Sequence, residues 1–246
     1  MASSQDQPWE LYYWNSIKED GRNHMLGRGE FIRLMFEVTG TPYIEVGKES
    51  PSKVFEMLDR SGKNPGIPLF APPIIKKGDF TLNQTPAIMK YLGKKFGLYP
   101  KTEELEAHAD ALMCFVTDLI AEGRLVFHAR CFTESYYTQQ DETKGHVQWF
   151  KTSRLPMFLK FLESSLTFNL KVHNEGYFIG NSLTYIDIAV WHTLIAAESQ
   201  FPDTYGEIAE SIPALVQFKG KIGSIPRIQE YLASDRRGFF EGNSMM

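Results

Sequence analysis

The side chains best suited to chemistry are hydroxyl groups near the start of the chain and cysteines in its second half. Tyr12 and Tyr13 lie in the first aromatic run, Trp9 to Trp14, and Ser16 follows it closely. The two cysteines, Cys114 and Cys131, form no CxxC pair, which excludes a zinc ribbon and a thioredoxin-type dithiol. The histidines form no HExxH or HxH set, so the sequence predicts no metal site.

Composition and charge narrow the class of protein. The chain has 246 residues, 43% of them hydrophobic and 23% charged, an ordinary composition for a globular protein with a core. Its net charge of −4 favours neither a nucleic-acid partner nor an anionic membrane surface. The N-terminus lacks the apolar core of a secretory signal, and no uncharged apolar run approaches about 18 residues. We therefore expect a cytoplasmic protein with reduced thiols and no membrane contact.

The first hundred residues predict a mixture of strands and helices. Phe31, Leu34, Met35 and Val38 follow the spacing of a helix face, and short aromatic or aliphatic runs predict strands around that helix. The predicted elements are strands at residues 9–14, 43–46, 72–75 and 80–82 and helices at 27–38, 50–60 and 85–96. Their order is a parallel βαβ unit followed by ββα.

Beyond about residue 102 the pattern becomes helical throughout. The predicted helices cover residues 103–129, 146–168 and 184–199, with shorter pieces within 212–232. Thr184 and Asp187 form a capping-box pattern that begins the third of these helices. The sequence thus predicts an α/β domain over residues 8–97, an all-helical domain over 102–235 and a C-terminal tail over 236–246.

A series of motifs resembles the cytosolic glutathione transferase family, in its tyrosine-type branch. The motifs are Tyr13 after the first strand, Gly27-Arg28-Gly29-Glu30 opening a helix, Pro72-Pro73 before a strand, Thr81-Leu-Asn-Gln-Thr-Pro-Ala-Ile88, and Gly180-Asn-Ser-Leu-Thr-Tyr-Ile-Asp187. The resemblance covers residues 10–234, nearly the whole chain. It implies a thioredoxin-like glutathione-binding domain followed by a helical domain that carries the acceptor-substrate pocket.

This resemblance also implies an activity. We expect a homodimeric transferase that conjugates the thiolate of glutathione, its co-substrate, to hydrophobic electrophiles without a metal. Two alternatives remain open. One is a non-catalytic protein of the same fold that binds ligands or partners, and the other is a glutathione-dependent isomerase or peroxidase.

Tyr13 is the expected catalytic residue. A thiol is nucleophilic as the thiolate, and a hydroxyl that donates a hydrogen bond to the sulfur stabilises that form. The family pattern of tyrosine followed by an aromatic residue favours Tyr13, because Trp14 comes next. Strand alternation places Tyr12 and Tyr13 on opposite faces, so only one can serve. Tyr12 and Ser16 remain alternatives.

The resemblance assigns further residues to glutathione. Arg28 would support the site electrostatically. Pro73 matches a cis-proline, and Pro72 stands where the family pairs its backbone with the ligand, although proline offers only a carbonyl. Gln84 and Thr85 would hold the γ-glutamyl carboxylate, with Thr85 as the N-cap of a helix whose first residue is Pro86.

The helical domain supplies the remaining candidates. Asp118 matches an acidic residue that reaches the γ-glutamyl amine across a dimer, although an intramolecular salt bridge is the alternative. Trp14, Phe127 and His128 are the expected residues of the acceptor pocket, and a structural histidine is the alternative for His128. The long loop between Tyr13 and Gly27 could cover the acceptor substrate, or it could be a solvated insertion without a role.

Overall fold

The structure, a computed structural model, describes residues 7–14, 26–58, 66–131 and 133–240, and its chain divides into two compact units. The first unit comprises Met1–Gly97 together with Ile225–Phe239, and the second comprises Leu98–Ser224 with Phe240–Met246. This division differs from the expected domains at the C-terminal end. Residues 225–239 group with the first unit because helix α11 (Pro226–Leu232) packs against α1 (Gly29–Thr39).

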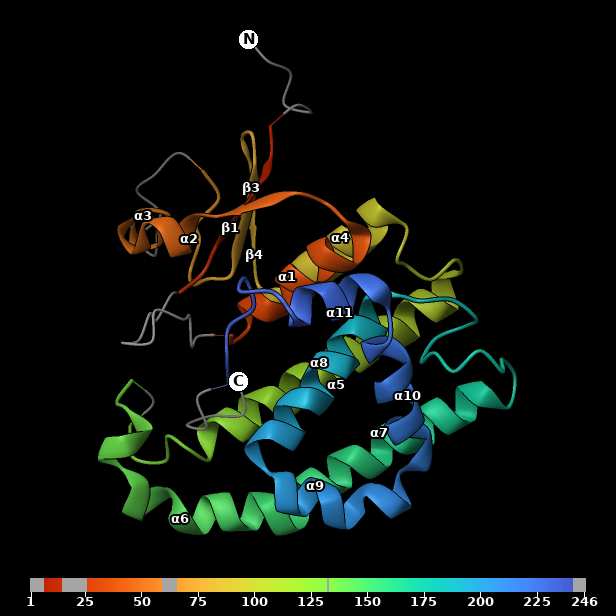
Figure 1. Cartoon of the computed structure of the whole chain (residues 1–246). Coiled ribbons are helices and arrows are strands. Elements are labelled where there is room, and N and C mark those ends of the chain that lie inside the picture. The colour runs from red at the N-terminus through yellow and green to blue at the C-terminus, as the bar shows by residue number, and fades with distance from the viewer. Residues whose placement is uncertain (1–6, 15–25, 59–65, 132, 241–246) are drawn as a thin grey trace. The chain divides into compact units, whose positions relative to one another are not determined.

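A four-stranded mixed sheet lies at the centre of the first unit (Figure 1). Its strands are β1 (Trp9–Tyr12), β2 (Tyr43–Glu45), β3 (Ile74–Lys77) and β4 (Phe80–Asn83), in the spatial order β2-β1-β3-β4. Strand β2 runs parallel to β1, whereas β3 runs antiparallel to both β1 and β4. The predicted order of βαβ followed by ββα is confirmed.

Helices cover both faces of this sheet, and β1 supplies side chains to each face. Helices α1 and α4 (Thr85–Phe96) lie on one side, and α2 (Val46–Glu49) and α3 (Pro51–Glu56) lie on the other (Figure 1). Trp9 packs against Phe36 of α1, with ring centroids 5.9 Å apart. Tyr12 belongs to a buried cluster with Val46 and Val54 on the opposite face. Successive residues of β1 therefore face different helices, as strand geometry requires.

The second unit is helical in its described part. Its longer helices are α5 (Glu103–Leu125), α6 (Gln140–Trp149), α7 (Leu155–Leu170), α8 (Tyr185–Gln200), α9 (Pro202–Ile208) and α10 (Pro213–Gly223). Every residue of α8 from Tyr185 to Leu194 is buried. A helix that is buried on all sides forms the centre of a bundle, and α5, α9 and α10 pack against α8. Among the residues that the structure describes, none of the helices is long and apolar enough to span a bilayer.

Some helix boundaries differ from the sequence prediction. The predicted helix over residues 146–168 is two helices, α6 and α7, joined by a π-helical segment at Phe150–Arg154. Pro156 at the start of α7 has no N–H, so the regular hydrogen-bond ladder cannot continue across this point. Helices α2 and α9 were not predicted, and α5 ends at Leu125 rather than near residue 129.

The predicted capping box of α8 is confirmed. The Asp187 carboxylate accepts bonds from the Thr184 N–H and hydroxyl, both at 2.8 Å, and from the Phe178 N–H at 2.7 Å. Burial raises the pKa of Asp187 to about 6, and these hydrogen bonds oppose that rise. The carboxylate is therefore ionised at neutral pH and ties the start of α8 to the preceding turn.

Substitution of Asp187 tests this role. Asp187→Ala should lower the free energy of unfolding by about 3 kcal/mol, because it leaves two buried N–H groups without an acceptor. Asp203→Ala is the matched control, since Asp203 is an exposed acid in the first turn of α9 and its loss should change stability by less than about 0.5 kcal/mol. Urea denaturation of both variants at pH 7 measures the difference, and equal values would contradict the assignment.

Candidate functional site

Tyr13 lies where β1 ends and α1 begins. Its hydroxyl oxygen accepts a hydrogen bond of 2.8 Å from the backbone N–H of Arg28, which occupies the N-cap position of α1. The side chain is buried and faces the α1 side of the sheet, because residues 9, 11 and 13 alternate with 10 and 12. The phenol oxygen thus sits at the positive end of a helix.

Glycines allow this close approach. A Cβ atom at Gly27 would lie 2.1 Å from the Tyr13 hydroxyl oxygen, and one at Gly29 would lie 2.6 Å from the ring. A Cβ atom at Gly47 would lie 1.8 Å from the Tyr13 carbonyl oxygen. No other residue type fits at these three positions without moving the tyrosine, which explains the Gly-Arg-Gly sequence that opens α1.

The alternatives to Tyr13 as the catalytic residue are Tyr12 and Ser16, and the structure describes only Tyr12. The Tyr12 hydroxyl donates to the Glu10 carboxylate at 2.6 Å, on the face covered by α2 and α3. Burial and the neighbouring Glu10 raise the pKa of Tyr12. This bond and location favour a structural role for Tyr12. Ser16 lies outside the described residues, as does most of the predicted long loop.

Strand register brings two further predicted residues, Pro73 and Gln84, to the same end of the sheet as Tyr13. Tyr12 pairs with Ile74 across β1 and β3, and Ile74 pairs with Asn83 across β3 and β4. Tyr13, Pro73 and Gln84 are the residues next to these pairs, so they stand side by side on adjacent strands. The peptide bond between Pro72 and Pro73 is cis, and Gln84 has a φ of 72°. A non-glycine residue at positive φ is strained, and such residues concentrate at ligand sites.

Helix α4 begins directly behind Gln84. Gln84 occupies the N-cap position and Thr85 is the first helical residue, so the expected N-cap role of Thr85 is corrected by one position. The Thr85 side chain is only 5% exposed, and its hydroxyl makes no hydrogen bond within the described part of the chain. A buried hydroxyl without a partner costs free energy, and a ligand at the helix N-terminus would satisfy it.

Of the candidate site residues in the second unit, Asp118 is exposed and Phe127 is buried. Asp118 is exposed on α5 and forms no ion pair with any described residue, so the alternative of an intramolecular salt bridge is not observed. Phe127 is 2% exposed and stacks on Phe201, with ring centroids 5.9 Å apart. This packing favours a core role for Phe127 over the expected role in the acceptor pocket.

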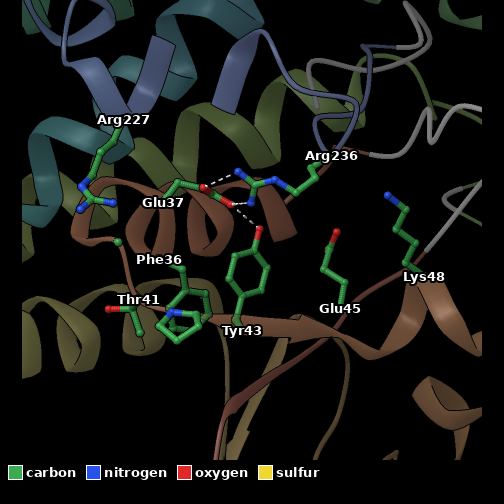
Figure 2. A pocket seen from close by; sticks show the side chains of 10 residues that line it. Phe36, Glu37, Thr41, Tyr43, Glu45, Lys48, Arg227 and Arg236 are labelled. Atoms are coloured by element: carbon green, nitrogen blue, oxygen red, sulfur yellow. Dashed lines mark hydrogen bonds and ion pairs between the residues drawn. The ribbon is translucent and has the colours of Figure 1, made fainter. Parts of the chain in front are cut away.

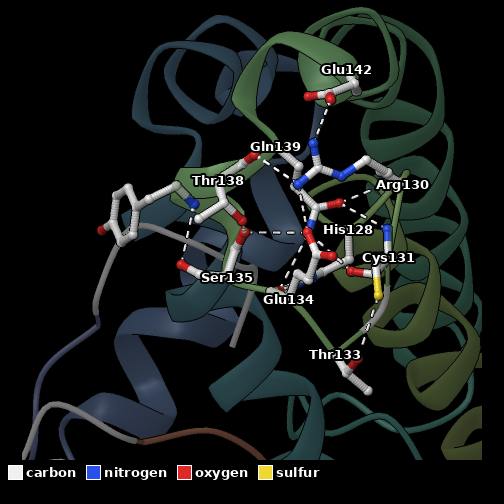
Figure 3. Close-up of polar contacts among 10 residues, drawn as sticks. His128, Arg130, Cys131, Thr133, Glu134, Ser135, Thr138, Gln139 and Glu142 are labelled. Atoms are coloured by element: carbon white, nitrogen blue, oxygen red, sulfur yellow. Dashed lines mark hydrogen bonds and ion pairs between the residues drawn. The ribbon is translucent and has the colours of Figure 1, made fainter.

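His128 belongs to a loop that polar contacts hold in place (Figure 3). Its Nδ1 lies 3.0 Å from the carbonyl oxygen of Glu134, so Nδ1 carries the hydrogen and Nε2 is the acceptor. Burial and the nearby Arg124 lower the pKa of His128, which is neutral at pH 7. The fully buried amide of Gln139 bonds the backbone of Arg130 and Glu134 and so fixes the loop.

A cavity of about 420 Å³ lies in the first unit, beside the C-terminal end of α1 (Figure 2). Phe36 and Tyr43 line its floor, and Glu37 accepts bonds from Tyr43 at 3.0 Å and from both terminal nitrogens of Arg236. None of the predicted site residues lines it. Among the described residues no group of three or more side chains could hold a metal ion.

Comparison with known proteins identifies the family. A family model described as "Glutathione S-transferase, C-terminal domain" matches residues 127–235. Glutathione S-transferase 4 of Caenorhabditis elegans is 31% identical over 214 residues, which cover 83% of this chain and 90% of that protein. The chain belongs to the glutathione S-transferase family.

Other glutathione S-transferases extend this likeness over the full length. A glutathione S-transferase of Plasmodium yoelii yoelii is 28% identical over 229 residues, covering 93% of this chain and 99% of that protein. The crystal structure of monomeric Na-GST-3, a glutathione S-transferase of the hookworm Necator americanus, has the same fold, with a TM-score of 0.69, 23% identity and coverage of 95% and 99%. The predicted family, fold and transferase activity are confirmed.

Sequence reasoning missed one buried residue of this glutathione S-transferase that contacts Tyr13. The Arg33 guanidinium carbon lies 5.7 Å from the centroid of the Tyr13 ring, within the range of a cation–π contact. A signal was present, because Glu30 and Arg33 are opposite charges three residues apart in a helix whose other residues are mostly apolar.

Two glycine-to-alanine substitutions test the packing around Tyr13. Gly29→Ala should destabilise the protein by about 1–3 kcal/mol, because the added methyl group must displace the Tyr13 ring. Gly220→Ala is the matched control, since Gly220 lies within α10 with open space at its Cβ position and should gain about 0.5–1 kcal/mol. Thermal unfolding of both variants measures the two changes in stability. If both substitutions stabilise the protein, the close contact between Gly29 and the Tyr13 ring is contradicted.

Proposed function

We propose that Tyr13 activates glutathione by donating a hydrogen bond to its sulfur atom. The observation that carries this proposal is the bond from the Arg28 N–H to the Tyr13 hydroxyl oxygen. A hydroxyl whose oxygen accepts a hydrogen bond becomes a stronger donor. The N-terminus of α1 adds positive potential at the same place. Both effects favour the thiolate of glutathione, whose thiol has an ordinary pKa near 8.5.

The γ-glutamyl carboxylate of glutathione would bind at the N-terminus of α4. The Thr85 hydroxyl is buried there without a hydrogen-bond partner among the described residues, and the strained backbone of Gln84 precedes it. The carbonyl of Pro72, at the same sheet end, would accept from the backbone of the ligand. Arg28 adds a cation at the start of α1. The N-termini of α1 and α4, together with the Thr85 hydroxyl and the Arg28 guanidinium as donors, thus suit an anionic tripeptide.

The reaction is a nucleophilic attack on a hydrophobic electrophile. The thiolate sulfur forms a bond to an electrophilic carbon, and the leaving group departs with the electron pair. Trp14 packs against the Tyr12 cluster on the face covered by α2 and α3 and contacts the Phe55 ring at a centroid distance of 5.0 Å, which favours a packing role over its expected role in the acceptor site. His128 stays a candidate, with its Nε2 as the acceptor atom, and Phe127 is left out because it lies in the core.

Replacement of Tyr13 by phenylalanine tests the central role. Tyr13→Phe should lower kcat for conjugation of a chloro-dinitro-aromatic about 10- to 100-fold at pH 7, the effect of losing one hydrogen bond to a charged group. The apparent pKa in the pH profile of kcat/KM should rise by about 1–2 units, towards that of the free thiol. An unchanged pH profile in Tyr13→Phe would exclude this residue as the thiol activator.

Thr85→Val is the matched contrast, because it removes a hydroxyl from the same unit without changing the donor to sulfur. It should raise the KM for glutathione about tenfold and leave the apparent pKa where it is in the wild type. Thr81→Val, on strand β4, is the control for loss of a threonine elsewhere in the sheet. If Thr81→Val and Thr85→Val have the same KM, the carboxylate does not bind Thr85.

We further propose that two copies of the chain associate through α5 and α7. Met157, Phe161 and Phe168 form an exposed apolar row on α7, with Phe161 48% and Phe168 70% exposed. The row continues onto α5, where the Phe115 ring lies 4.4 Å from that of Phe161. Asp118, one turn further along α5, is exposed and without an ion pair among the described residues. A row of exposed apolar side chains favours a protein partner. In a dimer, Asp118 of one copy would reach the γ-glutamyl amine of the glutathione bound to the other copy.

Sedimentation equilibrium tests the dimer. The wild type should have twice the chain mass of 28.2 kDa, and Phe161→Glu should be monomeric because a charge in the apolar row opposes its burial. Val216→Glu, an exposed apolar position on α10, should leave the mass unchanged. A monomeric wild type, like the hookworm relative, would refute the proposal.

We also infer a cytoplasmic location. Cys114 and Cys131 are both free, and Cys114 is exposed on α5. Exposed thiols persist in a reducing compartment, which is also where a thiol co-substrate stays reduced.

A further inference from the structure

Arg33 is a buried cation in the middle of α1. Its side chain is 3% exposed, and its Nε donates to the Glu45 carboxylate on β2 at 2.6 Å. One terminal nitrogen donates to the Glu30 carboxylate at 3.2 Å. Burial opposes the charge, but the two carboxylates outweigh it and raise the pKa of Arg33, so the guanidinium stays charged at any working pH.

The same guanidinium reaches the residues that surround the Tyr13 hydroxyl. It lies over the Tyr13 ring, and the nitrogen that contacts Glu30 also donates to the carbonyl oxygen of Leu26 at 3.1 Å. Leu26 immediately precedes Gly27, which packs against the Tyr13 hydroxyl. Arg33 therefore contacts Tyr13 from the ring side and holds the backbone that approaches it from the hydroxyl side.

A segment from the far end of the chain fixes Glu30. The Tyr231 hydroxyl donates to Glu30 at 3.0 Å, and the Nε of Arg237 lies 3.7 Å from the other carboxylate oxygen. Burial raises the pKa of Glu30, while Arg33 and Arg237 oppose that rise. Two carboxylates and two guanidinium groups thus lie together around Glu30 and Arg33, with α1, β2 and the end of the chain each contributing.

We propose that Arg33 is a positioning residue for glutathione activation, which holds the Tyr13 hydroxyl against the Arg28 N–H and strengthens it as a donor to sulfur. This inference rests on the proposed role of Tyr13. A fixed cation beside a phenol ring stabilises negative charge that develops on the phenol oxygen. The planar fork of arginine contacts two carboxylates, a carbonyl and a ring at once, which the single ammonium of lysine cannot do.

A purely structural role makes a different prediction. Loss of Arg33 would then lower stability and the amount of folded enzyme, but each folded molecule would activate glutathione at the ordinary pH. A positioning role changes the pH profile itself. Among the described residues, the charged and titratable groups around Tyr13 and Arg33 are Arg28, Glu30, Tyr43, Glu45, Tyr231 and Arg237, and all of them remain in an Arg33 variant.

The test is the pH profile of kcat/KM for Arg33→Lys, with activity expressed per folded molecule. The apparent pKa should rise by about one unit, and kcat at pH 7 should fall about tenfold. The KM for glutathione should stay within about twofold of the wild type, since Thr85 and Gln84 are untouched. Arg154→Lys is the matched control, because it makes the same change at an arginine whose carboxylate partner is Glu122 rather than a residue of the Arg33 cluster. Its pH profile should equal that of the wild type.

A double-mutant cycle separates this inference from the proposed function. In the Tyr13→Phe background, Arg33→Lys should have no further effect on the pH profile, because the hydroxyl that it positions is gone. If Tyr13→Phe shifts the profile and Arg33→Lys does not, the inference on Arg33 is wrong while the function stands. If Tyr13→Phe itself has no effect, the proposed function fails.

A second variant covers the case in which Arg33→Lys does not fold. Glu45→Gln keeps the guanidinium but replaces its closest carboxylate with an amide, so the position of Arg33 is less fixed. It should shift the apparent pKa in the same direction by a smaller amount. A wild-type profile in a folded Glu45→Gln variant, together with an unfolded Arg33→Lys, would count against the positioning role.

Discussion

The hydrogen bond between the Arg28 N–H and the Tyr13 hydroxyl is the contact on which the proposed chemistry depends. It joins the end of β1 to the start of α1 and sets the phenol oxygen at a helix N-terminus. Side chains at Gly27 or Gly29 would prevent it. Strand alternation decides which tyrosine can make it, because Tyr12 faces the other side of the sheet and bonds Glu10. A small set of local constraints thus selects one hydroxyl from two neighbours.

The rest of the proposed glutathione site follows from the sheet. The antiparallel registers of β1 with β3 and of β3 with β4 place Pro73 and Gln84 beside Tyr13. Helix α4 begins at this edge, and its first residue, Thr85, buries a hydroxyl that has no hydrogen-bond partner in the part of the chain that the structure describes. An acidic tripeptide with a thiol at its centre suits an edge with two helix N-termini, a hydroxyl donor for the sulfur and a second hydroxyl for the carboxylate.

The sequence predicted those features of the fold that depend on contacts between neighbouring residues. Helix α4 begins and ends at the predicted residues, and the Thr184–Asp187 capping box is present, because both depend on neighbours within one or two turns. The order of the motifs was sufficient to indicate the family and Tyr13. Contacts between distant residues were not predictable, since nothing in the sequence near Tyr231 indicates a bond to Glu30. Phe127 shows the same limit, because only the packing of the helical unit reveals that it lies in the core.

A crystal structure with glutathione bound tests the central claim most directly, through the distance between the sulfur atom and the nearest hydroxyl oxygen. The account predicts that the Tyr13 hydroxyl lies within hydrogen-bond distance of the sulfur and keeps its bond from the Arg28 N–H. It also predicts that the γ-glutamyl carboxylate accepts a bond from the Thr85 hydroxyl. A sulfur atom held instead by Ser16 or Tyr12, with Tyr13 out of reach, would contradict the account.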